Sequence, residues 1–151
     1  MQTENIVAGA DVVMELLNVC PEIIQLVDEN GNTPLHSAAS AGHREITAML
    51  LKLEPRLAEK YNSSGFTPLH LAAMNYKFGV FQGFVMMAVS SFQCLTKEGE
   101  TVFHVAAKHG QYDALILLIR LCNGMDLFNC QDRHGNTILH LAAYEGHHRV
   151  R

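Results

Sequence analysis

The sequence predicts an all-α solenoid of helix-turn-helix units joined by short hairpin-like turns. A nine-residue motif beginning at Gly31 recurs from Gly65, Gly99 and Gly135, at spacings of 34, 34 and 36 residues. Gly, Thr, an apolar residue, His and two Ala hold the same places in every copy. Such a period is typical of repeat proteins, in which each unit buries its apolar face against its neighbours. Because 48% of the residues are hydrophobic and 17% charged, the chain can form a continuous core.

These motifs resemble the ankyrin repeat, whose hallmark is Thr-Pro-Leu-His-x-Ala-Ala in a unit of about 33 residues. The tetratricopeptide repeat has a similar period, but it expects Trp, and this chain contains none. The resemblance covers nearly the whole chain. It implies an ankyrin-repeat solenoid forming a single domain over residues 1–151.

Each motif has a physical reason. The glycines lie in polar surroundings and suit a turn that needs positive φ. A threonine then precedes each first helix as its N-cap, and Pro34 and Pro68 occupy the first helical position. The paired alanines let the first helices pack closely. The N-cap residues are Thr33, Thr67, Thr101 and Thr137.

A histidine in every motif invites a metal-binding or catalytic interpretation. A residue repeated in every copy belongs to the repeat, and buried polar groups are normally hydrogen-bonded. The ankyrin resemblance implies that this side chain bonds to the turn backbone and the Thr hydroxyl. We therefore predict a structural role for His36, His70, His104 and His140.

Residues 1–27 read as a partial or degenerate repeat. The stretch 12–23 aligns with 46–57 at an offset of 34, and both contain a Leu-Leu pair followed by a helix-ending Pro. The motif is missing before Val12, so Asn5 to Ala10 form either a degenerate first helix or a cap.

Residues 28–61 form the most regular predicted unit. We expect a first helix through Ala41, a break at Gly42 and His43, and a second helix from Arg44 to Leu53.

Residues 62–95 keep the motif but differ after it. Tyr76 replaces the glycine expected between the two helices, which puts that turn in doubt. The stretch between Lys77 and Lys97 is uncharged and long enough to span a bilayer, but its register favours a buried solenoid helix. Met86 and Met87 make the outer face apolar, which indicates a thicker core, cover by missing neighbouring repeats or a partner-binding patch.

Residues 96–131 restore the inter-helix glycine at Gly110 and carry two extra residues near Asn123, which lengthen a loop. Residues 132–151 are a truncated repeat, with a first helix to about Tyr144 and a break at Gly146. Half repeats at both ends lead us to expect a fragment of a longer protein.

A narrower resemblance is to plant ankyrin proteins with a C-terminal Pro-Gly-Gly membrane domain. It rests on the Leu-Leu-x-x-x-Pro endings at 16–21 and 50–55 and on the run 135–142. The membrane domain is absent here. The resemblance implies defence or stress signalling, in the cytoplasm or, through the missing part, at the cytoplasmic face of the plasma membrane.

Several chemistries are not indicated. A net charge of −4 and the lack of a Lys/Arg run argue against nucleic-acid binding. The four cysteines have no metal-ligand spacing, and neither a phosphate-binding loop nor a catalytic motif occurs. The adjacent His147 and His148 point in different directions on a helix, so they do not indicate a metal site. We predict no enzyme activity, no cofactor and no small-molecule substrate.

The predicted function is a scaffold or adaptor that binds another protein through its turns and first helices. Alternatives are the cytosolic regulatory part of a multi-pass membrane protein and the targeting domain of an enzyme whose catalytic part lies elsewhere. Phe66 is the expected anchor, as an exposed aromatic at a turn tip. The candidate contacts in the turns are Glu29, Asn30, Asn32, Ser64, Phe66, Lys97, Glu98, Glu100, Arg133, His134 and Asn136, and those in the first helices are Ser40, Met74, Asn75, Lys108, His109, Tyr144 and Glu145.

Overall fold

The computed structural model describes the backbone of residues 2–149 and the side chains of residues 9–146. This part of the chain contains helices and turns and no strand, which confirms the predicted all-α class. The α-helices are α1 (Gln2–Val19), α2 (Pro34–Ala41), α3 (Arg44–Leu53), α4 (Pro68–Met74), α5 (Phe81–Met87), α6 (Val102–Lys108), α7 (Tyr112–Leu121) and α8 (Ile138–Arg149). Short 3-10 helices are η1 (Pro21–Gln25), η2 (Pro55–Glu59), η3 (Phe78–Val80) and η4 (Val89–Gln93).

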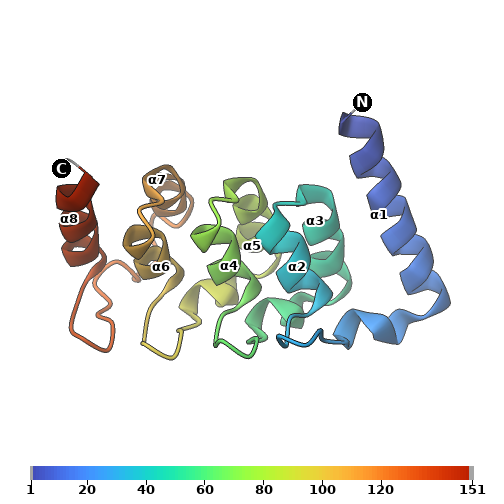
Figure 1. The fold of residues 1–151 in the computed structure, drawn as a ribbon, viewed down its shortest axis with the longest axis horizontal. Helices are drawn as coiled ribbons and strands as arrows, with labels where there is room; N and C mark the ends of the chain where they lie inside the picture. Colours follow the sequence, from blue (N-terminus) through green and yellow to red (C-terminus); the bar gives the residue numbers. More distant parts are fainter. Residues whose placement is uncertain (1, 150–151) are drawn as a thin grey trace.

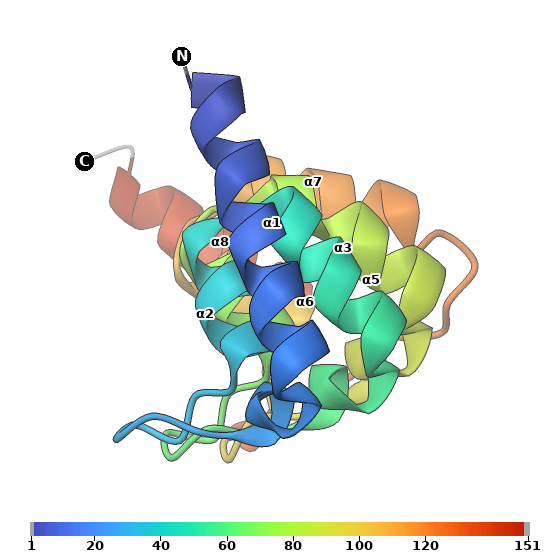
Figure 2. The ribbon, with the colours of Figure 1, turned by 90° about the vertical axis from the view of Figure 1, so that its right-hand side faces the viewer.

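The helices form two rows along one axis, from α1 at one end to α8 at the other (Figure 1). The first helices α2, α4, α6 and α8 make one row, and the second helices α3, α5 and α7 make the other (Figure 2). The motif turns project from one end of the helices, and the inter-helix turns lie at the opposite end (Figure 1). The molecule is therefore a solenoid whose turns share one edge.

The motif residues set where the first helices begin. The hydroxyl of Thr33 accepts the N–H of His36, and the His36 ring accepts the N–H of Thr33, which closes a capping box. Thr67 and Thr101 form the same box. Helix α2 ends at Gly42, whose φ of 77° lets the chain turn into α3, so both helix bounds of this unit are as predicted.

The core lies between the two rows. It combines the motif leucines and alanines of the first helices with larger side chains of the second helices. Four phenylalanines and a row of leucines are less than 2% exposed. The largest of these side chains are Phe81, Phe84, Phe92, Phe103, Leu35, Leu51, Leu69 and Leu118.

The uncharged stretch folds as η3, α5 and η4, as a solenoid segment and not as one long helix. Within the described residues, none of the helices combines the length and apolar character needed to cross a bilayer. Phe81 and Phe84 are buried, whereas the Met86 side chain is 74% exposed. The outer face of this unit is therefore apolar. Within the described residues Met86 is not part of the core, so a thicker core does not account for it.

Two expectations at the ends of the chain were wrong. Asn5 to Ala10 form neither a separate helix nor a cap, because α1 runs without interruption from Gln2 to Val19. The stretch contains no Pro, and Gly9 alone does not break a helix that α3 supports. Helix α8 likewise continues through Gly146, which lacks the positive φ of the inter-helix glycines Gly42 and Gly110.

Tyr76 occupies the turn position held by Gly42 and Gly110 in the neighbouring units. Its φ is 61°, and it is the one non-glycine residue with positive φ in the described chain. Two contacts compensate for the strain. The Tyr76 hydroxyl donates to an Asp113 carboxylate oxygen at 2.8 Å, and its ring meets Phe78 edge to face at 5.4 Å.

Replacing Tyr76 with Gly or with Ala removes both the hydroxyl bond and the ring contact. The difference in stability between the two variants therefore measures the backbone strain at this position. We expect Tyr76→Gly to be more stable than Tyr76→Ala by about 1 kcal/mol, since only glycine adopts positive φ without steric cost. Urea unfolding of the two variants measures the difference. Equal midpoints would show that the turn changes shape and that Tyr76 is unstrained.

Candidate functional site

The predicted binding face includes the four motif turns. In each turn, a side chain of the turn itself accepts hydrogen bonds from the turn backbone. An Asp28 carboxylate oxygen accepts the N–H groups of Asn30 and Asn32, both at 2.9 Å. The bond from the Asn32 N–H is the main cause that lowers the pKa of Asp28. Asp132 makes the same bonds to His134 and Asn136 in the last turn, at 2.9 and 2.8 Å.

The two central turns use other residues for the same purpose. The Asn62 amide oxygen accepts the N–H groups of Ser64 and Phe66, at 3.1 and 3.0 Å. The Thr96 hydroxyl accepts those of Glu98 and Glu100, at 3.3 and 3.2 Å. All four turns are therefore rigid, which holds the side chains at their tips in fixed places.

Glu100 does not match its expected place on the binding face, because it is only 5% exposed. The Thr96 hydroxyl donates to one carboxylate oxygen at 3.0 Å, and the Lys108 ammonium lies 2.8 Å from the other. This bond raises the pKa of Lys108. Since Thr96 stands where Asp28 and Asp132 stand in other turns, Glu100 is drawn inward as an acceptor for its hydroxyl.

Lys108→Met should lower the free energy of unfolding by about 1–3 kcal/mol, because Glu100 would keep a buried charge without its partner. Adding Glu100→Gln should restore most of that loss, and the double-mutant cycle gives the coupling between the two side chains. An equal loss in both backgrounds would show that the ion pair contributes nothing.

The four histidines make the bonds that the resemblance implied. In every motif the ring Nδ1 accepts the N–H of the N-cap threonine, at 3.1 or 3.2 Å. Nε2 therefore carries the proton in the neutral ring. It donates to the next turn from His36, at 3.0 Å from the Phe66 carbonyl, and from His104, at 3.0 Å from the Asn136 carbonyl. These bonds tie each ring to its own turn, and those of His36 and His104 also tie it to the next turn.

Phe66 is not the exposed tip expected of an anchor. Its side chain is half-buried, and its ring meets His70 edge-on at 6.4 Å. Its carbonyl also receives the His36 bond, so the residue belongs partly to the scaffold.

The other candidate contacts differ in exposure. Of the turn and first-helix candidates, Asn32, Glu98, Asn136, Ser40, Met74 and Glu145 are half-buried. The exposed ones are Glu29, Asn30, Ser64, Lys97, Arg133, His134, Asn75, Lys108, His109 and Tyr144. Arg133 and His134 flank Glu98 at 3.8 and 3.5 Å, which makes a mixed-charge group at the third and fourth turns.

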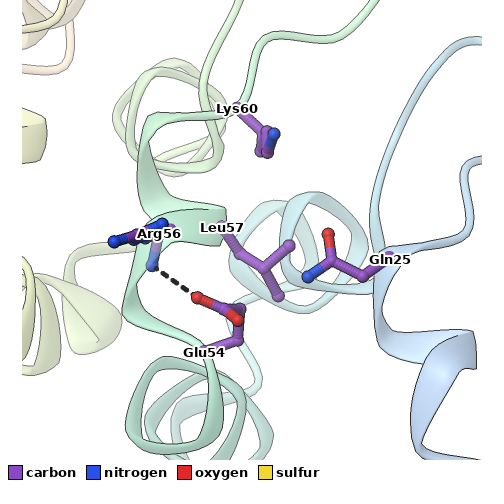
Figure 3. A pocket seen from close by; sticks show the side chains of 5 residues that line it. All are labelled: Gln25, Glu54, Arg56, Leu57 and Lys60. Carbon is purple, nitrogen blue, oxygen red and sulfur yellow. Dashed lines mark hydrogen bonds between the residues drawn. The ribbon is translucent and has the colours of Figure 1, made fainter.

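Sequence reasoning missed a hollow of about 190 Å³ between η1 and η2, away from the predicted face (Figure 3). Gln25, Glu54, Arg56, Leu57 and Lys60 line it. Glu54 accepts the Arg56 N–H at 3.4 Å. No motif marks this hollow, because it forms only where two neighbouring units meet. Arg56 and Lys60 give the hollow two exposed cations beside the Glu54 carboxylate.

Metal and thiol chemistry find little support in the described part. Among these residues, no group of three or more His, Cys, Asp or Glu could hold a metal ion. The four cysteines are free, and burial raises the pKa of Cys122 to about 11. Since the thiolate is the reactive form, this raised pKa disfavours reaction of Cys122 at neutral pH.

Stacked helix pairs with capped Thr-His turns define this chain as a helical repeat protein. The family model for ankyrin repeats, described as three copies, matches residues 6–88 and 79–150. The chain belongs to the ankyrin repeat family. A comparison with curated proteins returned no match. Family membership indicates a protein–protein interaction module, and this fold is typically non-catalytic.

Proposed function

We propose that the chain is a scaffold or adaptor that binds another protein across its turn tips and the exposed side of its first helices. The observation that carries this proposal is the row of four internally braced turns. Each is braced internally, yet the side chains at its tip differ from copy to copy. Glu29, Ser64, Lys97 and Arg133 are exposed there on a constant framework. A repeat scaffold with variable exposed residues can recognise a partner without any catalytic group.

The composition of the face favours a polar partner surface. Acidic, amide, hydroxyl and basic side chains alternate along the tips, and Met74 and Tyr144 add apolar contacts on the first helices. A mixed-charge rim of this kind contributes more to specificity than to affinity.

The plant resemblance extends this proposal to stress or defence signalling in the cytoplasm. The same resemblance supports the second candidate, the cytosolic regulatory part of a multi-pass membrane protein. A third is the targeting domain of an enzyme whose catalytic part lies elsewhere. The gene's complete transcript separates them, because membrane helices would favour the second and a catalytic motif the third.

Arg133→Ala combined with His134→Ala should abolish or strongly weaken partner binding. Both side chains are 69% exposed, so we expect the free energy of unfolding to change by less than about 0.5 kcal/mol. Titration calorimetry with the isolated partner and urea unfolding test the two effects separately.

Lys52→Ala with Arg120→Ala is the matched control, because it removes two exposed cations from the second helices α3 and α7. It should leave binding unchanged. If the control weakened binding as much as the turn variant, the turn face would not be the binding surface.

A further inference from the structure

The four turns are not joined in the same way along the stack. We call the contact between α2–α3 and α4–α5 the first junction, that between α4–α5 and α6–α7 the central junction, and that between α6–α7 and α8 the last junction. At the first junction the Ser63 N–H donates to the Asn30 carbonyl at 2.9 Å. At the last, the Arg133 N–H donates to the Glu98 carbonyl at 2.8 Å.

The corresponding backbone bond of the central junction is missing. By the repeat register it would join the Lys97 N–H to the Ser64 carbonyl, and no such bond occurs among the described residues. A backbone hydrogen bond thus joins the neighbouring turn tips at both outer junctions, and no backbone bond joins them at the central one.

A second bond is missing at the same place. The His36 and His104 rings each reach the carbonyl of the next turn, whereas Nε2 of His70 has no partner although the side chain is 1% exposed. In the alignment of the repeats, the carbonyl that corresponds to the acceptors of His36 and His104 is that of Glu100. A buried N–H group without an acceptor is unfavourable, so a conformation that gives the ring N–H of His70 an acceptor is favoured.

Lys97 occupies the space between these turns. An added Cβ at Gly31 would lie 2.7 Å from Ser63 Oγ and 2.9 Å from the Ser63 backbone N, and one at Gly99 would lie 3.2 Å from the Arg133 backbone N. At Gly65 the nearest atoms belong instead to the Lys97 side chain, with Cγ at 2.8 Å. The Lys97 ammonium also donates to the Ser63 carbonyl at 3.2 Å. The backbone of the third turn is therefore replaced by a side chain at this point.

The opposite end of the central junction is firmly held. The Tyr76 hydroxyl donates to Asp113 at 2.8 Å, and the Gln111 side-chain amide donates to the Met74 carbonyl at 3.1 Å. Both bonds lie at the inter-helix turns, far from the motif turns along the helices (Figure 1). The junction is thus fixed at one end and open at the other.

We propose that the central junction is a hinge, held open at the turn tips by the Lys97 side chain and pinned at the inter-helix turns by Tyr76 and Gln111. Closing it forms two bonds together, from the Lys97 N–H to the Ser64 carbonyl and from Nε2 of His70 to the Glu100 carbonyl. Closure brings the third and fourth turns toward the first two. The hinge therefore changes the curvature of the turn edge, whether or not a partner is bound there.

Spin labels on equivalent positions test the hinge in the full 151-residue chain. The pairs 30/64, 64/98 and 98/134 report the first, central and last junctions. Cys20→Ser, Cys94→Ser and Cys130→Ser remove the accessible thiols, and buried Cys122 is kept. We expect a longer mean distance and a wider distribution for 64/98 than for the other two pairs. Three equal distributions would overturn the proposal.

Lys97→Ser tests the wedge, since Ser63 holds this place at the first junction. We expect the 64/98 distance to shorten and narrow to match 30/64. Arg133→Ser is the matched control at the last junction, where the backbone bond already exists, and it should leave 98/134 unchanged. An unchanged 64/98 distance in Lys97→Ser would overturn the role of Lys97.

The ring N–H of His70 gives a second measurement that does not depend on the labels. In nitrogen-15 NMR spectra, His36 and His104 should show slowly exchanging Nε2 protons in the unmodified chain, and His70 should not. Lys97→Ser should add a slowly exchanging His70 signal. Its continued absence in a folded variant would contradict closure.

Discussion

Replacing Phe103 with Ala is expected to lower the free energy of unfolding by about 3–5 kcal/mol. The side chain is fully buried, and its ring centre lies 6.5 Å from that of Phe92 and 5.3 Å from that of Phe128. The substitution removes a large apolar surface from the middle of the stack and leaves a cavity between the two helix rows. Because a domain is stabilised by only about 5–15 kcal/mol, this variant should approach complete unfolding.

Two further variants separate burial from residue type. Phe103→Leu restores the residue found at this motif position in other copies, as Leu35 or Leu69, and should cost less than about 1.5 kcal/mol. Phe78→Ala removes a phenylalanine that is 46% exposed and should cost far less than Phe103→Ala. Urea unfolding followed by circular dichroism measures all three. If Phe78→Ala and Phe103→Ala cost the same, the core would not lie where the structure places it.

Acidification is expected to destabilise the chain through its buried histidines. Burial lowers the pKa of His70 from 6.5 to about 4 and also lowers that of His36. The carbonyls of Cys94 and Glu100 oppose the shift in His70, but neither meets hydrogen-bond geometry with its Nε2. Burial is the larger effect and keeps the pKa of His70 low.

The sign of the effect follows from linkage. The unfolded chain binds a proton at His70 more readily than the folded chain, so stability falls as the pH falls. The contribution of the neutral ring is complete above pH 6.5 and is lost between about 6.5 and 4. At the lower end His70 alone should account for about 3 kcal/mol.

Denaturant unfolding across this pH range measures the loss. His70→Gln should be less stable than the unmodified chain near neutral pH and should show a weaker pH dependence, because it cannot take up the proton. His43→Gln changes an exposed histidine and serves as the control. A pH dependence that survives unchanged in His70→Gln would contradict the role of His70 and assign the acid sensitivity to His36 or to the carboxylates.

The features predictable from the sequence were those that repeat. The Thr33 cap, the bond of His36 Nδ1 to Thr33 and the break at Gly42 each follow from a local rule. Their local geometry needs no knowledge of the rest of the chain, which is why the repeat architecture and the bounds of α2 and α3 followed from the sequence.

The misjudged features depend on side-chain contacts that the repeated motif does not set. Glu100 is buried because Thr96 and Lys108 converge on it, and Phe66 is half-buried because its ring lies against His70. The positive φ of Tyr76 is held by Asp113 in the next unit. The repeat spacing does not encode these contacts, since the first two form between a turn and the helix that follows it, and the third forms between two units.

The most direct test of the proposed binding face is site-specific photo-crosslinking in cells. A photoreactive phenylalanine analogue at Ser64 or at His134 samples the turn tips, and the same analogue at Lys52 or Gln82 samples exposed positions on the second helices. The proposal predicts that both turn positions crosslink to the same protein and that Arg133→Ala with His134→Ala abolishes the product. Crosslinks to that protein from Lys52 or Gln82, with none from Ser64 and His134, would contradict it.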